Sequence, residues 1–162
     1  GMIALAIGFL LVIIFMFIKY KVFGLITNLT LIINLFILLG ILTLFEATLT
    51  LPGIAGIILT VGMAVDANVL IFERIKEELK NEKNNIIAFD SGYIKSRTAI
   101  IDANITTLLA AIILFFMGSG PIKGFSVTLG IGIFTTLFSV YFIARLFTSL
   151  YVSKNRNKER LI

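Results

Sequence analysis

Two aspartates, Asp66 and Asp102, lie inside long apolar runs of a chain of 162 residues. Placing a carboxylate inside a membrane helix costs on the order of 3 kcal/mol, so the group must be paired, protonated or facing water. Desolvation raises the pKa of a carboxyl group and an opposite charge lowers it. A carboxyl group under both influences can take up and release a proton near neutral pH, as a proton-coupled transporter requires. We therefore predict that Asp66 carries a proton, and for Asp102 we leave a functional and a structural role equally open.

A structural role is the alternative for both aspartates, which could instead cap a neighbouring helix or bond to a threonine or asparagine. For Asp102 the two interpretations stay open, because Asn104, Thr106 and Thr107 follow it closely. The chain contains no histidine and no cysteine. It therefore lacks the usual near-neutral base, the usual metal ligand and any thiolate, so proton chemistry falls on carboxylates. We expect no cofactor, no metal site and no enzymatic activity.

The elements that must position these aspartates are membrane helices. Hydrophobic residues make up 59% of the chain and charged residues 14%, and the mean hydropathy is +1.07. Because a bilayer core of about 30 Å takes roughly 20 apolar residues in a helix, the apolar runs predict an all-α polytopic bundle of about five transmembrane helices. The expected spans are residues 2–18, 25–45, 52–72, 98–117 and 124–150.

Between the third and fourth spans the sequence turns polar. Residues 73–83 interleave both charge signs at helical spacing, which favours a solvated extension of the third helix. Ile86, Phe89, Tyr93 and Ile94 then recur at helical spacing beside charged residues. That pattern predicts a short amphipathic helix on the cytoplasmic membrane surface.

The basic residues predict the orientation. Of the 14 lysines and arginines, only Lys123 falls on one side of the five predicted spans, and the others follow spans one and three or lie toward the carboxyl end. By the positive-inside rule the side with the excess is cytoplasmic, so the amino end is expected outside and the carboxyl end inside. The net charge of +5 thus follows membrane topology, and we expect no nucleic-acid partner.

Helix geometry places the two aspartates at similar depth. Asp66 precedes Glu73 by seven residues, roughly 10 Å at 1.5 Å per residue, and Asp102 follows Arg97 by five, about 7 to 8 Å by the same rise. Because the third and fourth spans run antiparallel, both carboxyl groups are expected near the cytoplasmic side. Whether they touch stays open.

Small and polar residues mark the third span as a central helix. They recur there at i, i+4 spacing, and Gly62 lies one turn before Asp66 on another face. Small faces let helix backbones approach closely in membranes, so we expect this helix to be enclosed by its neighbours and Asp66 to be buried. The expected helix-packing residues are Gly56, Thr60, Gly62, Ala64, Asn68 and, in the fourth span, Thr106.

Three stretches resemble a known family. Residues 51–79 read LPGIAGIILTVGMAVDANVLIFERIKEEL, residues 101–125 read IDANITTLLAAIILFFMGSGPIKGF, and the chain opens GMIALAIGFLLVIIFMFIKYKVFGLI. They resemble the second, fourth and fifth membrane helices in the SecD branch of the SecD/SecF protein-export family, and together they cover nearly the whole chain. The single acidic residue of the VDAN segment and the following FER triplet fit the SecD form rather than the SecF form.

The resemblance implies several expectations. Members of this family are bacterial inner-membrane proteins related to the resistance–nodulation–division superfamily. In the family, SecD and SecF form pseudo-symmetric six-helix halves. They associate with the SecYEG channel and use the proton-motive force to promote protein export. Asp66 would hold the proton-relay position with polar partners from SecF, and Asp102, which also matches a family position, would have only a supporting role. The chain would then be a fragment without the first helix and the large external domain that engages exported polypeptide.

Three alternatives remain at this point. A small-molecule efflux subunit of the same superfamily would use similar proton chemistry, although the VDANVLIFERI form argues against it. An intramembrane aspartyl protease could be built on two aspartates from neighbouring helices, but Asp66 follows Met63-Ala64-Val65 in place of the Gly-x-Gly that presenilin-like enzymes carry. The third is a passive scaffold in which Asp66 only pairs helices.

Overall fold

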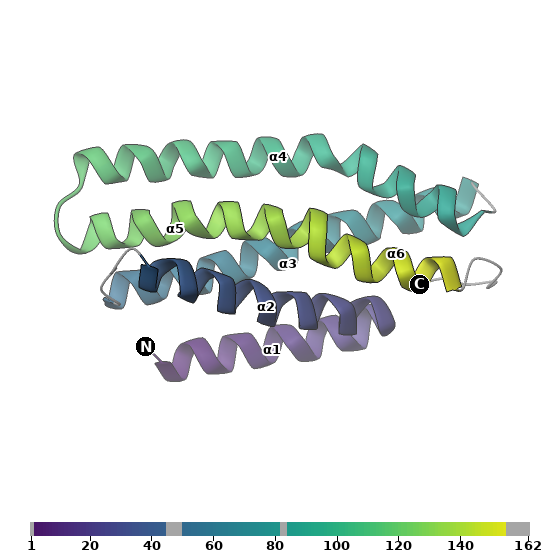
Figure 1. Cartoon of the computed structure of the whole chain (residues 1–162), viewed down its shortest axis with the longest axis horizontal. Helices are drawn as coiled ribbons and strands as arrows, with labels where there is room; N and C mark the ends of the chain where they lie inside the picture. The colour runs from purple at the N-terminus through teal and green to yellow at the C-terminus, as the bar shows by residue number, and fades with distance from the viewer. Residues whose placement is uncertain (1, 45–49, 82–83, 155–162) are drawn as a thin grey trace.

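The computed structural model describes residues 2–44, 50–81 and 84–154 and is helical through nearly all of them (Figure 1). Within these ranges five helices are long and apolar enough to cross a membrane, which confirms the predicted bundle. They are α1 (Met2–Tyr20), α2 (Val22–Leu44), α3 (Leu51–Asn81), α4 (Asn85–Met117) and a composite fifth span. The fifth span consists of α5 (Pro121–Phe138), the π-helical segment η1 (Ser139–Ala144) and α6 (Arg145–Lys154).

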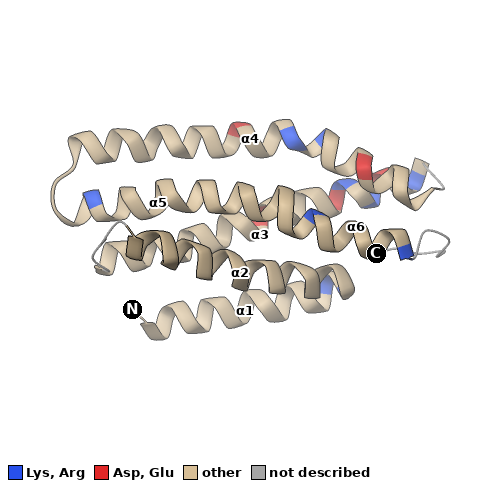
Figure 2. Ribbon diagram, in the orientation of Figure 1, with Lys and Arg blue, Asp and Glu red and all other residues tan. Residues whose placement is uncertain are grey.

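Consecutive spans run in opposite directions along the bundle, so α3 and α5 point the same way (Figure 1). Most of the charged residues lie toward one end, which we call the charged end, and a lysine lies near the opposite end, at the start of α5 (Figure 2). That lysine is Lys123, near the start of α5. Residue 45, where the second predicted span ends, and residues 82–83, which end the predicted charged extension, lie outside the described residues, as do 1, 46–49 and 155–162.

The short surface helix predicted around residues 86–95 is wrong as a separate element. These residues form the first turns of α4, which continues without a break through the fourth span. Asn84 caps the start of this long helix, because its side-chain oxygen accepts hydrogen bonds from the backbone N–H groups of Ile86 and Ile87. The segment has no proline and its one glycine, Gly92, packs closely against α3, so nothing ends the helix before the membrane.

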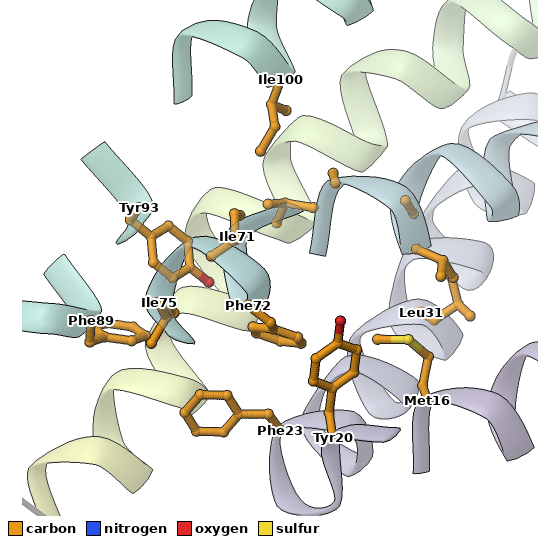
Figure 3. Packing of buried hydrophobic residues seen from close by; sticks show 14 of the residues in the cluster. Met16, Tyr20, Phe23, Leu31, Ile71, Phe72, Ile75, Phe89, Tyr93 and Ile100 are labelled. Carbon is orange, nitrogen blue, oxygen red and sulfur yellow. The ribbon is translucent and has the colours of Figure 1, made fainter. Parts of the chain in front are cut away.

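α3 is the central helix, in contact with α1, α2, α4, α5 and η1. Its charged extension, Glu73–Asn81, continues the same helix, as the sequence predicts. At the charged end α3 packs through Phe72 and Ile75 against aromatic side chains from α1, α2 and α4 (Figure 3). The aromatic partners in this cluster are Tyr20, Phe23, Phe89 and Tyr93. The first span is peripheral by contrast, since only Met16 and Tyr20 of α1 are buried.

Two glycine–threonine pairs hold α3 against α5. A Cβ atom on Gly56 would lie 3.1 Å from Cγ2 of Thr128, and one on Gly132 would lie 3.1 Å from Cβ of Thr60. In each helix the two members are four residues apart, so the pairs are reciprocal along one seam, which we call the α3–α5 seam. Thr60 Oγ1 also donates a hydrogen bond of 2.8 Å to the carbonyl of Gly56, which fixes its side chain in the seam.

Beyond the seam, the fifth span changes its winding. Residues Ser139–Ala144 form a π-helical turn between α5 and α6, and three of them, Ser139, Val140 and Ala144, are buried. Such wide turns inside an α-helix are rare and accommodate an extra residue. Just before the turn, the amide of Asn34 donates a buried 3.5 Å hydrogen bond to the hydroxyl of Thr136, linking α2 to α5.

Candidate functional site

Asp66 lies on the outer face of α3, where it is exposed in this chain, so the expectation that it is buried within its own bundle is wrong. The neighbouring Val65 and Ala67 are buried, as is Asn68. Positions 66 and 68 differ by about 200° around an ideal helix, which places the amide inside the bundle and the carboxylate outside. The central helix is therefore enclosed on most sides and open at Asp66.

The carboxylate borders a shallow hollow of about 120 Å³ between α3 and α4. From α3 the hollow is lined by Met63, Asp66, Ala67 and Leu70, and from α4 by Ile100, Ala103, Asn104 and Thr107. The walls are mostly apolar, and three polar side chains are the exceptions. The sequence predicts only that these two helices run antiparallel, and their packing shows that Asn104 and Thr107 share a hollow with Asp66.

Asp66 has no hydrogen-bond or ion-pair partner among residues 2–44, 50–81 and 84–154. The side-chain amides on these two helices donate within their own helix: that of Asn104 donates to the carbonyl of Ile100, and that of Asn68 donates to the carbonyl of Ala64. Thr107 likewise donates to the carbonyl of Ala103. Inside the described part of the chain, Asp66 is therefore a bare carboxylate on an apolar helix.

Asp102 does not join Asp66. It is exposed on α4 and is not among the residues that line the hollow. Its backbone carbonyl accepts a hydrogen bond from Thr106, a contact internal to α4. An aspartyl protease needs two carboxyl groups that face one another, and the hollow that Asp66 borders is not lined by Asp102.

Some of the residues predicted to pack helices are buried inside the bundle, and others lie on its open surface. Gly56, Thr60, Ala64 and Asn68 are buried, and the first two form half of the α3–α5 seam. Gly62 and Thr106 do not pack inside the chain: a Cβ on Gly62 would meet nothing within 4 Å, and Thr106 is exposed. Both lie on helix faces that this chain leaves open.

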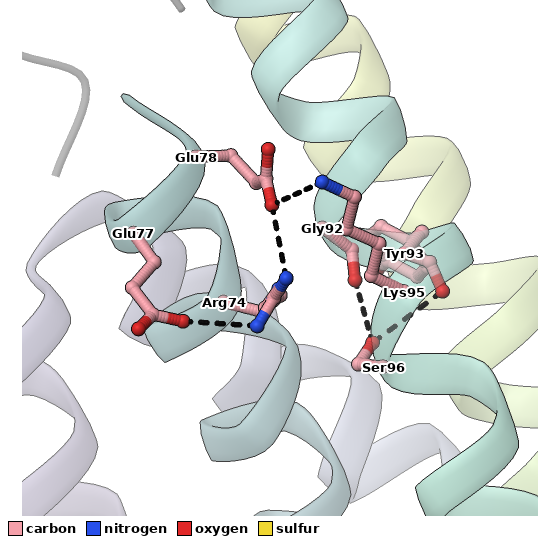
Figure 4. A network of polar contacts seen from close by, with 7 residues as sticks. All are labelled: Arg74, Glu77, Glu78, Gly92, Tyr93, Lys95 and Ser96. Carbon is pink, nitrogen blue, oxygen red and sulfur yellow. Dashed lines mark hydrogen bonds and ion pairs between the residues drawn. The ribbon is translucent and has the colours of Figure 1, made fainter. Parts of the chain in front are cut away.

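A polar network at the charged end joins α3 to α4 (Figure 4). Lys95 Nζ lies 2.9 Å from Oε1 of Glu78, and Arg74 bridges Glu77 at 3.1 Å and Glu78 at 3.3 Å. Glu78 is the most enclosed member, with 12% of its side chain exposed. Lys95 lowers the pKa of Glu78, first through their hydrogen bond, and Arg74 adds to the effect. The link is therefore kept at neutral pH and lost only when acid protonates Glu78.

A second polar cluster ties the end of α1 to α3. The hydroxyl of Tyr20 donates a 2.7 Å hydrogen bond to Oε1 of Glu73. The same oxygen lies 3.3 Å from the ammonium of Lys19 and 3.6 Å from that of Lys76. Both clusters join helices just outside the apolar spans, and sequence reasoning missed the links because their members are 17 and 53 residues apart. No group of carboxylates able to hold a metal ion occurs in the described residues.

Comparison with known proteins gives a consistent picture. The family model described as protein export membrane protein SecD/SecF, C-terminal, matches residues 1–154. The protein translocase subunit SecD of Magnetococcus marinus is 49% identical over 158 residues, which cover 98% of this chain and 30% of the relative. Its counterpart from Koribacter versatilis is 51% identical over 161 residues, covering 99% and 30%. The chain thus spans less than a third of the length of these relatives.

Solved structures show the same likeness in three dimensions. The crystal structure of SecDF from Thermus, described as a translocon-associated membrane protein, superimposes with a TM-score of 0.90 at 41% identity. The match covers 99% of this chain and 22% of that one. SecDF in its super-membrane-facing form gives a TM-score of 0.89 at 41% identity over 95% of this chain and 21% of the other. At this identity and coverage the likeness extends to the arrangement of all five spans.

Proposed function

Because the chain belongs to the SecD/SecF protein-export membrane family, we propose that it is the membrane part of a SecD translocase subunit that promotes protein export with the proton-motive force. Asp66 carries this proposal: it is an unpartnered carboxylate on a central apolar helix, beside a hollow, in a chain without histidine. Such a group is costly in a bilayer, and carboxylates inside membrane spans commonly mark proton or ion pathways. We assign it the role of proton-relay carboxylate, with Asp102 supporting it from α4.

The open face around Asp66 supports a partner subunit on that side. Gly62 offers a surface without a side chain, and Thr106 adds a polar group on α4. Small residues allow a second helix to approach closely, and polar ones bond across the contact. We propose that SecF covers this face and brings hydrogen-bonding groups to Asp66. We also propose association with the SecYEG channel, and contact with exported polypeptide through parts of the full-length protein outside residues 1–162.

Export driven by a proton gradient tests the function. Full-length protein, partner subunit and channel would be reconstituted in vesicles carrying a preprotein trapped partway through translocation. We expect completion of translocation to speed up when a proton gradient is imposed and to slow to the basal rate when an ionophore collapses it. Vesicles that lack the full-length protein are the control, and their rate of translocation should not change when the gradient is imposed. Equal stimulation with and without the protein would contradict the proposal.

The proposed orientation places the charged end in the cytoplasm of a bacterial cell and the α4–α5 turn outside. Single cysteines can test it, because residues 1–162 contain none of their own. In full-length protein freed of other cysteines, Ser119→Cys should react with a membrane-impermeant maleimide in intact cells. Asn81→Cys should react only after the membrane is permeabilised. Both positions are exposed, so the reverse pattern would show that the orientation is inverted.

A further inference from the structure

A second concave feature lies at the other end of the bundle, away from Asp66. It is an apolar groove of about 250 Å³ between α4 and α5, which we call the α4–α5 groove. Its walls are Leu108, Ala111, Ile112, Phe115 and Phe116 of α4, and Ser126, Val127, Gly130, Ile131 and Phe134 of α5. The one hydroxyl of the lining, on Ser126, donates to the carbonyl of Lys123 at 2.7 Å and is thereby satisfied. The groove therefore suits a hydrocarbon occupant.

A lysine, Lys123, lies at the end of this groove that is nearest the α4–α5 turn. Lys123 precedes Val127 by four residues and Gly130 by seven, which places it on the same face of α5 as the lining. Its ammonium lies 5.6 Å from the centre of the Phe115 ring, which is itself part of the wall. Lys123 is exposed and has no ion-pair partner within the described ranges. It is also the lone basic residue on its side of the five spans.

The start of α5 adds to the positive potential at this point. The helix begins at Pro121 after Gly120, and no side chain caps it. The N-terminus of a helix carries a partial positive charge and favours an anion. Lys123 and the start of α5 thus form a positively charged site that adjoins one end of the apolar groove, at the end of a membrane span. Lys123 and Phe134 are eleven residues apart, roughly 16 Å along the axis, about half of the ~30 Å hydrocarbon core.

We propose that the α4–α5 groove binds one anionic phospholipid. An acyl chain fills the groove over one leaflet, and the phosphate group lies against Lys123 and the start of α5. Complementary charge at one end and an apolar wall of one-leaflet length favour a lipid over a protein segment. The orientation given under the proposed function makes this the outer leaflet, but the groove and its cation do not depend on export activity.

Gly130 provides a sharp way to block the groove. A Cβ atom at this position would meet nothing within 4 Å, so a larger side chain enters the groove without disturbing the helix contacts. Gly40 is a matched control on α2, where an added Cβ also meets nothing within 4 Å and the residue is exposed. For the charge, Lys123→Gln removes it and Lys123→Arg keeps it.

Native mass spectrometry of the full-length protein with its partner subunit tests the proposal. The complex would be extracted in mild detergent from vesicles of phosphatidylethanolamine and phosphatidylglycerol, and the bound phosphatidylglycerol measured. We expect the wild type, Lys123→Arg and Gly40→Leu to retain it. Lys123→Gln should retain about 5-fold less, as expected for loss of one cation near an anionic lipid. Gly130→Leu should retain none in the groove.

Three results would overturn the lipid site. Equal retention by all variants would show that no lipid occupies the groove. Loss with Gly130→Leu but not with Lys123→Gln would show an occupant without a recognised charge. Loss of the partner subunit from Gly130→Leu, with phosphatidylglycerol unchanged, would show that a protein fills the groove. Thermal unfolding of each variant separates these outcomes from misfolding, and gradient-driven export in the same preparations reports separately on the proposed function.

Discussion

Asp66→Asn in the full-length protein is expected to abolish the stimulation of export by a proton gradient. Asparagine keeps the shape of the side chain but has no proton to exchange, so a relay through position 66 stops. Assembly with SecF should stay intact, because asparagine keeps the size of the side chain and its amide oxygen can still accept hydrogen bonds from the partner. Removing a bare carboxylate, which costs on the order of 3 kcal/mol in a membrane helix, should leave thermal stability unchanged or slightly higher.

Asp102→Asn is the companion variant for this experiment, because Asp102 is proposed only to support the relay. It makes the same chemical change on the neighbouring helix, at a position outside the hollow, and should keep most of the gradient-driven stimulation. Asp66→Glu retains a proton-exchanging group and should keep part of it. Normal export by Asp66→Asn would rule out the relay. Loss of the complex in its place would favour the scaffold role, in which the aspartate only pairs helices.

Gly132→Ala is expected to destabilise the bundle by about 1 to 3 kcal/mol, the usual cost of overpacking a core. The new Cβ would lie 3.1 Å from Cβ of Thr60 and closer still to its Oγ1 and Cγ2. Thr60 cannot easily turn away, because its hydroxyl is bonded to the carbonyl of Gly56. The α3–α5 seam would have to open along the central helix. Unfolding of the full-length protein in a denaturing detergent measures the effect.

Gly130→Ala makes the same substitution two residues earlier, where the added Cβ meets nothing within 4 Å. It should stabilise the helix by about 0.5–1 kcal/mol, the usual difference between glycine and alanine in a helix interior. Thr60→Ala combined with Gly132→Ala should recover part of the loss, since the two positions are in contact and their effects should not add. Equal stability of the Gly132 and Gly130 variants would show that the seam is not tightly packed.

The number of spans and the central place of α3 could be predicted from the sequence, because both depend on local composition. Apolar length sets the spans, and small residues at i, i+4 spacing identify a helix that others approach. The face of α3 that each residue occupies could not be predicted. Gly56 packs against Thr128 while Gly62 lies open, yet the two glycines look alike in sequence. Small residues suit a contact inside the chain and one with another subunit equally well.

The start of α4 shows a second limit. Phe89 and Tyr93 alternate with charged residues in a way that also describes a helix lying on a membrane. In the structure they are buried against Ile75 on the extension of α3, and Gly92 lets the two helices meet closely beside them. An amphipathic pattern records that one face is covered, and it does not tell whether lipid or protein covers it. The ion pair between Lys95 of α4 and Glu78 of α3 adds a polar contact between the same two helices.

The π-helical turn at Ser139–Ala144 sets the rotation of α6 about the helix axis, and so decides which of its residues face the core. One residue corresponds to about 100° of rotation in a regular helix. An ordinary α-helix through this stretch would therefore turn α6 away from its present neighbours and carry Thr148 and Val152, now buried, out of the core. It would also move Arg145, whose guanidinium lies 5.1 Å from the centre of the Tyr93 ring. Losing or gaining a single residue in this stretch would thus change which side of the last helix faces its neighbours, while leaving its composition almost the same.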